Sequence, residues 1–153
     1  IEVEFAGLNE ALVCGGNVTT YAHSFSLSLL RAVRVVFVGC DYSWMTPDDF
    51  YAGGEHRVMS DERMNGERIF SCILPDGNEC ATNFTLFHLK TWHEELAVAH
   101  PGHCVNATEG GILGVGEKGN LLGGWKHMTL AEAVAAYTTS KAAVLDPHEA
   151  IQA

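Results

Sequence analysis

The N-terminal third of the chain moves from a helical to a strand-like pattern of apolar positions. Apolar residues recur at helical spacing from Val18 to Leu29, which predicts a helix, although His23–Leu29 also alternates with the period of two that a strand shows. The run Val33–Val38 is continuously apolar and rich in β-branched residues, so it predicts a central, buried, parallel strand with helices on both sides. Ile1–Phe5 is expected to form a further short strand.

Helices and strands continue to alternate through the rest of the chain. Periodicity and flanking turn residues predict a weaker strand at Ile69–Leu74 with a turn at Pro75–Asn78, a helix at Asn83–Ala99, a strand at His103–Ala107, and a helix from the capping box Thr129–Glu132 through Tyr137. The longest of these helices carries Leu86, Leu89 and Leu96 on one stripe. Alternating elements of this kind favour an α/β domain with a mostly parallel sheet.

Composition and charge narrow the class of protein. At 153 residues the chain fits a single domain spanning 1–153, and with 47% hydrophobic residues it can bury a core without disulfides or a structural metal. Its formal net charge of −10, with scattered Lys and Arg, argues against a nucleic-acid partner, which needs clustered cations. The longest apolar run is too short to span a bilayer, so no membrane span is expected.

The cysteines indicate a reducing compartment. They are an odd number without framework spacing, which predicts reduced, mostly buried thiols in a cytoplasmic protein. The five are Cys14, Cys40, Cys72, Cys80 and Cys104. The chain also begins at Ile1, inside an expected strand and without an initiating Met, so we expect a fragment of a longer protein.

The segment 43–68 is polar and charged, with few apolar anchors. A long stretch of this composition predicts a lid that would carry Tyr51, His56 and Arg57 toward a ligand. The alternative interpretation is an insertion packed by a second subunit of a homo-oligomer, and the sequence leaves both open.

Polar turns lie where ligands of open α/β sheets bind, beyond the carboxyl ends of strands and at the starts of helices. Gly15, Gly16, Asn17 and Thr19 lie at the start of the first helix, where small residues let backbone amides approach a phosphate. An ordinary glycine turn with an Asn cap is the competing interpretation.

Two further turns supply carboxylates. Asp41 and Tyr42 follow the strand Val33–Val38, and a carboxylate there can hold a ribose hydroxyl or Mg²⁺. The turn after the last predicted strand, His103–Ala107, offers an amide, a hydroxyl, a carboxylate and a flexible backbone at Asn106, Thr108, Glu109 and Gly110. The simpler alternatives are a turn cap at Asp41 and a buried polar turn at Asn106–Gly111.

The histidines carry weaker signals. His93 with the following Glu begins like a zinc-protease helix, but Ala97 stands where the second histidine would be. His100–Cys104 has metal-like spacing but straddles a helix stop. We expect His23 to be packed or at the surface rather than to act as a base.

Taken together, the three turns resemble those of the MptE-like family, which includes archaeal 6-hydroxymethyl-dihydropterin diphosphokinases and the Maf flagellin glycosylation factors. That family is itself similar to bacterial CMP-sialic-acid sialyltransferases. The shared pattern is a Gly-Gly-x-Val turn opening a helix, a strand ending in Gly-x-Asp, a helix, and a strand ending in Asn-x-Thr-Glu-Gly-Gly. The corresponding segments here are Gly15–Val18, Gly39–Asp41, the helix after Thr82, and Asn106–Gly111, within a match from about Cys14 to Tyr137.

The resemblance implies a Rossmann-like three-layer α/β/α fold and a nucleotide-dependent transferase. In a diphosphokinase, Asp41 together with Glu109 would hold the Mg²⁺ that bridges the ATP phosphates, while Asn17–Thr19 would contact phosphate oxygens. In a glycosyltransferase, the same helix start and Tyr42 would bind the phosphate of a CMP-sugar.

Two departures from the family pattern keep another function class open. The family's first strand and its Gly-x-Gly-Pro-Ser-like turn have no counterpart in this chain. The histidine that sialyltransferases carry just before the helix that here begins near Asn83 is also absent from Glu79–Thr82. A catalytically silent nucleotide-binding or assembly domain is therefore the alternative to the enzyme.

Overall fold

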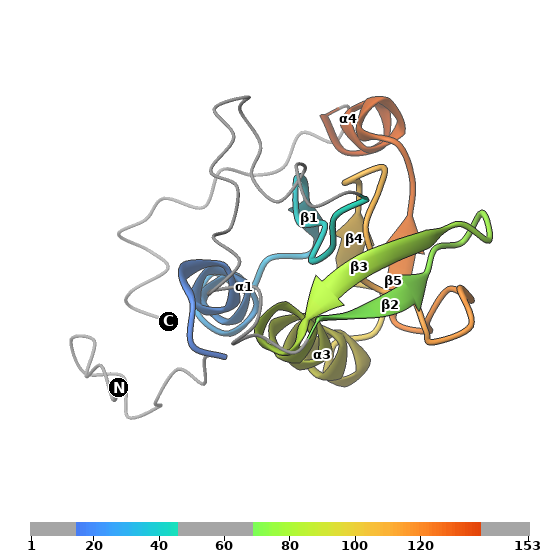
Figure 1. Ribbon diagram of the computed structural model, residues 1–153. Helices are drawn as coiled ribbons and strands as arrows, with labels where there is room; N and C mark the ends of the chain where they lie inside the picture. The colour runs from blue at the N-terminus through green and yellow to red at the C-terminus, as the bar shows by residue number, and fades with distance from the viewer. Residues whose placement is uncertain (1–14, 46–68, 139–153) are drawn as a thin grey trace, which may run out of the picture.

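The computed structural model describes residues 15–45 and 69–138. Its elements are α1 (Val18–Ser28), β1 (Val35–Phe37), β2 (Ile69–Ile73), β3 (Glu79–Asn83), α3 (Phe84–Ala99), β4 (Cys104–Asn106), β5 (Trp125–His127) and α4 (Leu130–Thr138) (Figure 1). The expected strand Ile1–Phe5 and residues 46–68 of the expected lid lie outside the described residues. No helix within the described ranges is long and apolar enough to cross a membrane.

Strands β1, β4 and β5 form one parallel sheet in the order β1-β4-β5. In the middle strand, Asn106 is paired with Phe37 on one side and with His127 on the other. Because parallel strands end at the same edge of a sheet, the turns that follow these three residues meet there. The described part therefore has helices and a small parallel sheet, as the sequence predicted. The Rossmann-like three-layer arrangement stays a prediction.

The central, buried position predicted for Val33–Val38 is not found among the residues that the structure describes. Within the described residues β1 pairs only with β4, so it is an edge strand of the sheet and not a central one. Phe37 is 5% exposed, whereas Val33 and Val38 are 70% and 53% exposed. A continuous apolar run indicates a strand, but the number of its neighbours depends on tertiary pairing that the run itself does not encode.

The buried central strand is β4. Cys104 and Val105 are at most 1% exposed, and Asn106 is 5% exposed. The polar Asn106 is tolerated because its side-chain amide donates to the Leu113 carbonyl at 2.8 Å. The predicted strand His103–Ala107 is thus confirmed, with a more central place than its short sequence indicated.

A second, antiparallel sheet consists of the hairpin β2–β3. The predicted turn is present: the Gly77 amide donates to the Leu74 carbonyl at 3.0 Å, and the Asp76 carboxylate accepts from the Asn78 amide at 2.9 Å. Gly77 has φ 85°, a left-handed conformation that favours glycine at the end of a three-residue hairpin loop.

Strand β3 was not expected from the sequence. It contains Glu, Cys, Ala, Thr and Asn, so no run of apolar or β-branched residues marks it. Its outer edge is partly covered because Trp44 and Ala81 exchange two backbone hydrogen bonds of 2.8 and 2.9 Å. Pairing on both sides therefore stabilises a strand of low intrinsic propensity.

The helices begin within a residue of their predicted starts, each behind a side-chain cap. The Asn17 side chain accepts a hydrogen bond from the Thr20 amide, and the Asn83 side chain accepts one from the Leu86 amide, both at 2.8 Å. The capping box at α4 is also confirmed, with the Thr129 amide donating to Glu132 at 2.8 Å and the Glu132 amide donating to the Thr129 hydroxyl at 3.2 Å.

The buried face of α3 differs from the predicted leucine stripe. Leu86, Leu89 and Leu96 are only half-buried. The buried side chains of this helix are those of Lys90, His93 and Ala97. The two polar ones are tolerated because each finds a partner: Lys90 forms an ion pair with Glu94 at 2.6 Å, and His93 hydrogen-bonds with two other side chains.

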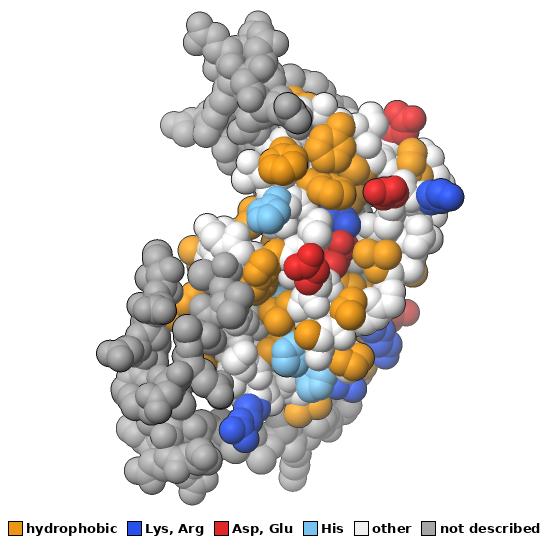
Figure 2. All heavy atoms as spheres, turned by 90° about the horizontal axis from the view of Figure 1, so that it is seen from below, with side chains coloured by type: hydrophobic (Ala, Val, Ile, Leu, Met, Phe, Trp, Pro, Cys, Tyr) orange, Lys and Arg blue, Asp and Glu red, His pale blue; other side chains and the backbone are white. Residues whose placement is uncertain are grey.

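On the face in Figure 2, acidic, basic and apolar side chains of the described residues are interspersed.

We predict that Asn83→Ala lowers the free energy of unfolding by roughly 1 kcal/mol, because the Leu86 amide at the start of α3 loses its acceptor. Urea unfolding of both proteins measures the difference. Thr85→Ala, an exposed change in the first turn of the same helix, is the matched control and should shift the stability by no more than about 0.5 kcal/mol. Equal effects of the two substitutions would contradict the capping role.

Candidate functional site

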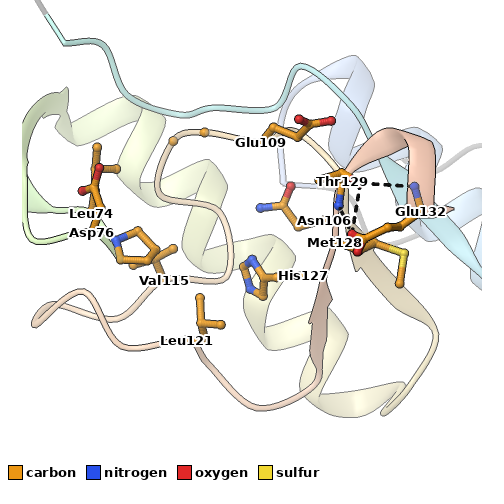
Figure 3. Close-up of a pocket in the computed structure, with 13 residues that line it drawn as sticks. Leu74, Asp76, Asn106, Glu109, Val115, Leu121, His127, Met128, Thr129 and Glu132 are labelled. Carbon is orange, nitrogen blue, oxygen red and sulfur yellow. Dashed lines mark hydrogen bonds between the residues drawn. The ribbon is translucent and has the colours of Figure 1, made fainter.

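A cavity of about 630 Å³ lies beyond the carboxyl ends of β4 and β5. It is lined by the hairpin turn, by the ends of the two strands, by the loop after β4 and by the start of α4 (Figure 3). The lining residues are Leu74, Pro75, Asp76, Asn106, Glu109, Gly110, Gly111, Val115, Leu121, His127, Met128, Thr129 and Glu132. Small-molecule sites of open α/β sheets occupy this position, so it is the candidate site of the described residues.

The turn after β1 is joined to the loop after β4. The Cys40 amide donates to the Thr108 hydroxyl at 3.2 Å, and the Ile112 amide donates to the Asp41 carbonyl at 2.8 Å. Gly111 has φ 69° and packs against the Asp41 backbone so closely that a β-carbon would overlap it. The structure therefore brings Asp41 and Thr108–Gly111 together, as the sequence predicted.

Asp41 itself is exposed, and its carboxylate faces the glycine loop. A β-carbon added at Gly110 would lie 3.2 Å from Asp41 Oδ1. Asp41 does not line the cavity, but Gly110 and Gly111 do. The carboxylate thus lies next to the cavity wall and stays accessible to a ligand.

Two of the predicted site residues hold the protein's own backbone. The Asn106 side chain accepts a hydrogen bond from the Thr108 amide at 2.9 Å, in addition to the bond that it donates to Leu113. Glu109, with φ 64°, accepts one from the Leu130 amide at 2.8 Å. Glu109 and Glu132 therefore bring two carboxylates to the start of α4, where the helix dipole favours negative charge.

The start of α1 does not belong to this cavity. Gly15, Gly16, Asn17 and Thr19 are not among its lining residues. Asn17 instead forms a capping box with Thr20, and its side chain lies close enough to Tyr42 to oppose the rise in the pKa of that phenol. The expected common site is thus divided: the Asp41 turn contacts the glycine loop at the cavity, while its neighbour Tyr42 contacts the α1 start.

A buried chain of hydrogen bonds starts from Tyr42. Its hydroxyl lies 2.7 Å from His93 Nε2, and His93 Nδ1 lies 2.9 Å from His23 Nδ1. His23 Nε2 lies 3.2 Å from the Cys104 thiol. His23 is therefore packed, one of the two places expected for it, and both imidazoles are at most 1% exposed.

Burial governs the ionisation of this chain. It lowers the pKa of His23 to about 3, with His93 contributing, and that of His93 to about 4. It raises the pKa of the Cys104 thiol to about 11 and raises the pKa of Tyr42 as well. All four groups are consequently neutral at pH 7.

The sequence did not draw attention to His127, the residue that ends β5 inside the cavity. Its Nε2 lies 3.2 Å from the Gly114 carbonyl, so Nε2–H is the donor, and burial lowers its pKa. A neutral ring with a proton on Nε2 has a lone pair on Nδ1. The signal that could have found it is its position two residues before the capping box at Thr129, where a strand passes into a helix.

The described residues contain no group of three or more His, Cys, Asp or Glu side chains arranged to hold a metal ion. Two residues of the segment His100–Cys104, whose spacing is metal-like, form hydrogen bonds within the protein. His103 Nδ1 donates to the Ala32 carbonyl at 3.1 Å, and Cys104 contacts His23. A single carboxylate such as Asp41 does not form a group of this size.

Comparison of the chain with protein-family models, with curated proteins and with solved structures finds no match. The resemblance to the MptE-like family therefore stays an expectation that comes from the turns quoted above.

We predict that the protein loses stability in acid because His23 and His93 are buried in their neutral forms. In the unfolded chain each takes up a proton near pH 6.5, but in the folded protein only near pH 3 and 4. As the pH falls below 6.5 the unfolded state binds more protons, so the free energy of unfolding decreases by up to about 1.4 kcal/mol per pH unit for each histidine.

Urea unfolding between about pH 7.5 and pH 4.5 measures this slope. His88→Gln, which changes an exposed histidine of α3, is the control and should keep it. A stability that stays constant between pH 6.5 and 4.5 would rule out the neutral buried pair.

Proposed function

We propose that this chain is the nucleotide-binding domain of a nucleotide-dependent transferase and that the nucleotide occupies the cavity beyond β4 and β5. The observation that carries the proposal is the position of this cavity at the carboxyl ends of adjacent parallel strands, with a glycine loop on one side and a helix start on another. The motif resemblance described from the sequence supports the same class.

The polar groups of the cavity suit the hydroxyl groups of a ribose or sugar. Asp76, Glu109 and Glu132 contribute carboxylates to its lining, and carboxylates accept hydrogen bonds from hydroxyl donors. The same charges repel a bare phosphate. A nucleotide would therefore direct its hydroxyls toward these acids and its phosphates toward the glycine loop beside Asp41.

Mg²⁺ fits this arrangement. It binds proteins through one or two carboxylates and completes its coordination with water and substrate phosphates, so a three-residue cage is not required. The exposed Asp41 carboxylate beside Gly110 is the group that would hold it, and the ion would neutralise phosphate charge there.

His127 would act on the acceptor substrate. Among the described residues that line the cavity it is the one histidine, and it is mainly neutral at pH 7 because burial lowers its pKa, with Nε2–H held by the Gly114 carbonyl. Its Nδ1 lone pair can take the proton that an acceptor hydroxyl loses as it attacks the phosphate of ATP or the sugar carbon of a CMP-sugar. The proposal covers both the diphosphokinase and the glycosyltransferase forms.

A binding or assembly domain without catalysis is the second candidate. Asn106, Glu109 and Glu132 already hold backbone groups of the protein, so their hydrogen-bonding capacity is partly used. The two candidates differ in turnover. An enzyme releases product from a bound nucleotide when an acceptor is present, and a silent domain does not.

We expect a nucleotide to stabilise the protein against heat. A panel of ATP, GTP, CTP, CMP and CMP-sugars, each with and without Mg²⁺, should contain at least one ligand that raises Tm. A ligand at a hundredfold excess over its Kd adds about 2.7 kcal/mol to the free energy of unfolding. If no member of the panel shifts Tm, the proposed function fails.

Asp41→Asn should weaken the Mg²⁺-dependent part of nucleotide binding by at least about tenfold, because the amide keeps the shape but removes the charge that would hold the ion. Glu79→Gln, on the exposed start of β3, removes the same charge away from the cavity and should leave the affinity unchanged. Calorimetric titration with and without Mg²⁺ measures both variants. Unchanged binding by the Asp41 variant would remove its metal role but leave the cavity as the binding site.

A further inference from the structure

Two cysteines face each other across the hairpin. Cys72 of β2 and Cys80 of β3 are directly paired in the antiparallel register. Directly opposed residues of two antiparallel strands lie on the same face of the sheet. Both thiols are free, and Cys80 Sγ lies 3.7 Å from the Cys72 carbonyl oxygen.

The backbone spacing of this pair suits a disulfide. Ala81 directs its amide and carbonyl to Trp44, so its neighbours Cys80 and Thr82 direct theirs to β2, since the direction alternates along a strand. Cys72 and Cys80 are therefore a hydrogen-bonded pair, with α-carbons about 5.5 Å apart. That distance lies inside the range of about 4.4–6.8 Å found for disulfides.

The β-carbons of such a pair are less well placed. They lie about 4.5–5.5 Å apart in a regular sheet, against about 3.8 Å in an average disulfide. The hairpin must twist slightly for the bond to form. A bond under such strain is more easily reduced than a structural disulfide, so it would be reversible.

The two thiols differ in accessibility. Cys72 is half-buried and lines a second cavity of about 640 Å³ between β2, α3 and the loop after β4. Cys80 is 4% exposed. An oxidant in the second cavity therefore reaches Cys72 first, and Cys80 is held in position to react with the product.

We propose that Cys72 and Cys80 are an oxidation site, at which hydrogen peroxide converts the two thiols into a reversible disulfide. The Cys72 thiolate attacks one oxygen of hydrogen peroxide, the O–O bond breaks, and a sulfenic acid forms while the leaving hydroxide takes up the proton that the thiol released and departs as the first water. Cys80 then attacks Cys72 Sγ, the S–O bond breaks, and the oxygen leaves with the Cys80 proton as the second water. Two thiols are oxidised and one peroxide is reduced.

This bond would connect the site to the candidate cavity. The hairpin turn between the two cysteines contributes Leu74, Pro75 and Asp76 to the cavity wall. A cross-link two residues before Leu74 fixes the strands that carry the turn. Oxidation would thus change the wall of the cavity without touching the glycine loop, whatever ligand the cavity takes.

Burial raises the pKa of both thiols, so only a small fraction of Cys72 is thiolate at neutral pH. The cross-link should accordingly form slowly at pH 7 and faster as the pH rises toward 9.

The test is peptide mapping of the full chain after treatment with hydrogen peroxide and alkylation of the remaining thiols. Cleavage after Arg68 and Lys90 gives one peptide that contains both cysteines, and a second cleavage before Asp76 separates them. The expected product is a pair of fragments that stays joined, about 2 Da lighter than the two thiol fragments together, and that separates after dithiothreitol treatment.

Cys72→Ser should abolish this joined product, and Cys40→Ser, which removes a half-buried thiol elsewhere, should leave its yield unchanged. Joined fragments that pair Cys72 or Cys80 with another cysteine would overturn the proposal. So would Cys72 that ends as sulfinic acid, or that remains fully alkylatable while other thiols are oxidised.

Discussion

The hydrogen-bonded pair of His23 and His93 is the contact on which the arrangement of the described elements depends. It joins α1 to α3, and its outer nitrogens reach Cys104 in β4 and Tyr42 after β1. Because both rings are buried, a lost partner would leave an unsatisfied polar atom at a cost of roughly 1–3 kcal/mol. Side-chain geometry at one point therefore sets how two helices lie on the parallel sheet.

The cavity wall depends on a second set of close contacts. Asp41 accepts a hydrogen bond from the Ile112 amide at 2.8 Å, and Glu94, already paired with Lys90, accepts one from the Gly114 amide at 2.9 Å. The loop after β4 is thus held from two sides. Gly111 and Gly114 both have positive φ and no room for a β-carbon, so this loop can approach its neighbours only with glycine at these positions.

The local sequence predicted the helices and strands themselves better than it predicted which elements lie beside them. Helix starts at Asn17, Asn83 and Thr129 were correct because a cap is satisfied within three residues of the chain. The edge position of β1, the strand β5 and the burial of His93 were missed because they depend on partners far along the sequence. Strand β3 was missed because its own residues have a low strand propensity. The same holds for the site. Asp41 and Thr108–Gly111 were predicted to lie together because each follows a strand, but His127 was not predicted because strand β5 was not.

The charges at the start of α4 restrict what the cavity can bind. A helix start is a ready site for a phosphate when its amides are free, but here Glu109 accepts from the Leu130 amide and Glu132 from the Thr129 amide. A phosphate at that position would have to displace a carboxylate and would also meet the charge of Asp76. Repulsion between these like charges would oppose the binding of a phosphate there. On the proposed function, the hydroxyl-bearing part of the nucleotide therefore belongs beside α4 and the phosphates beside the glycine loop.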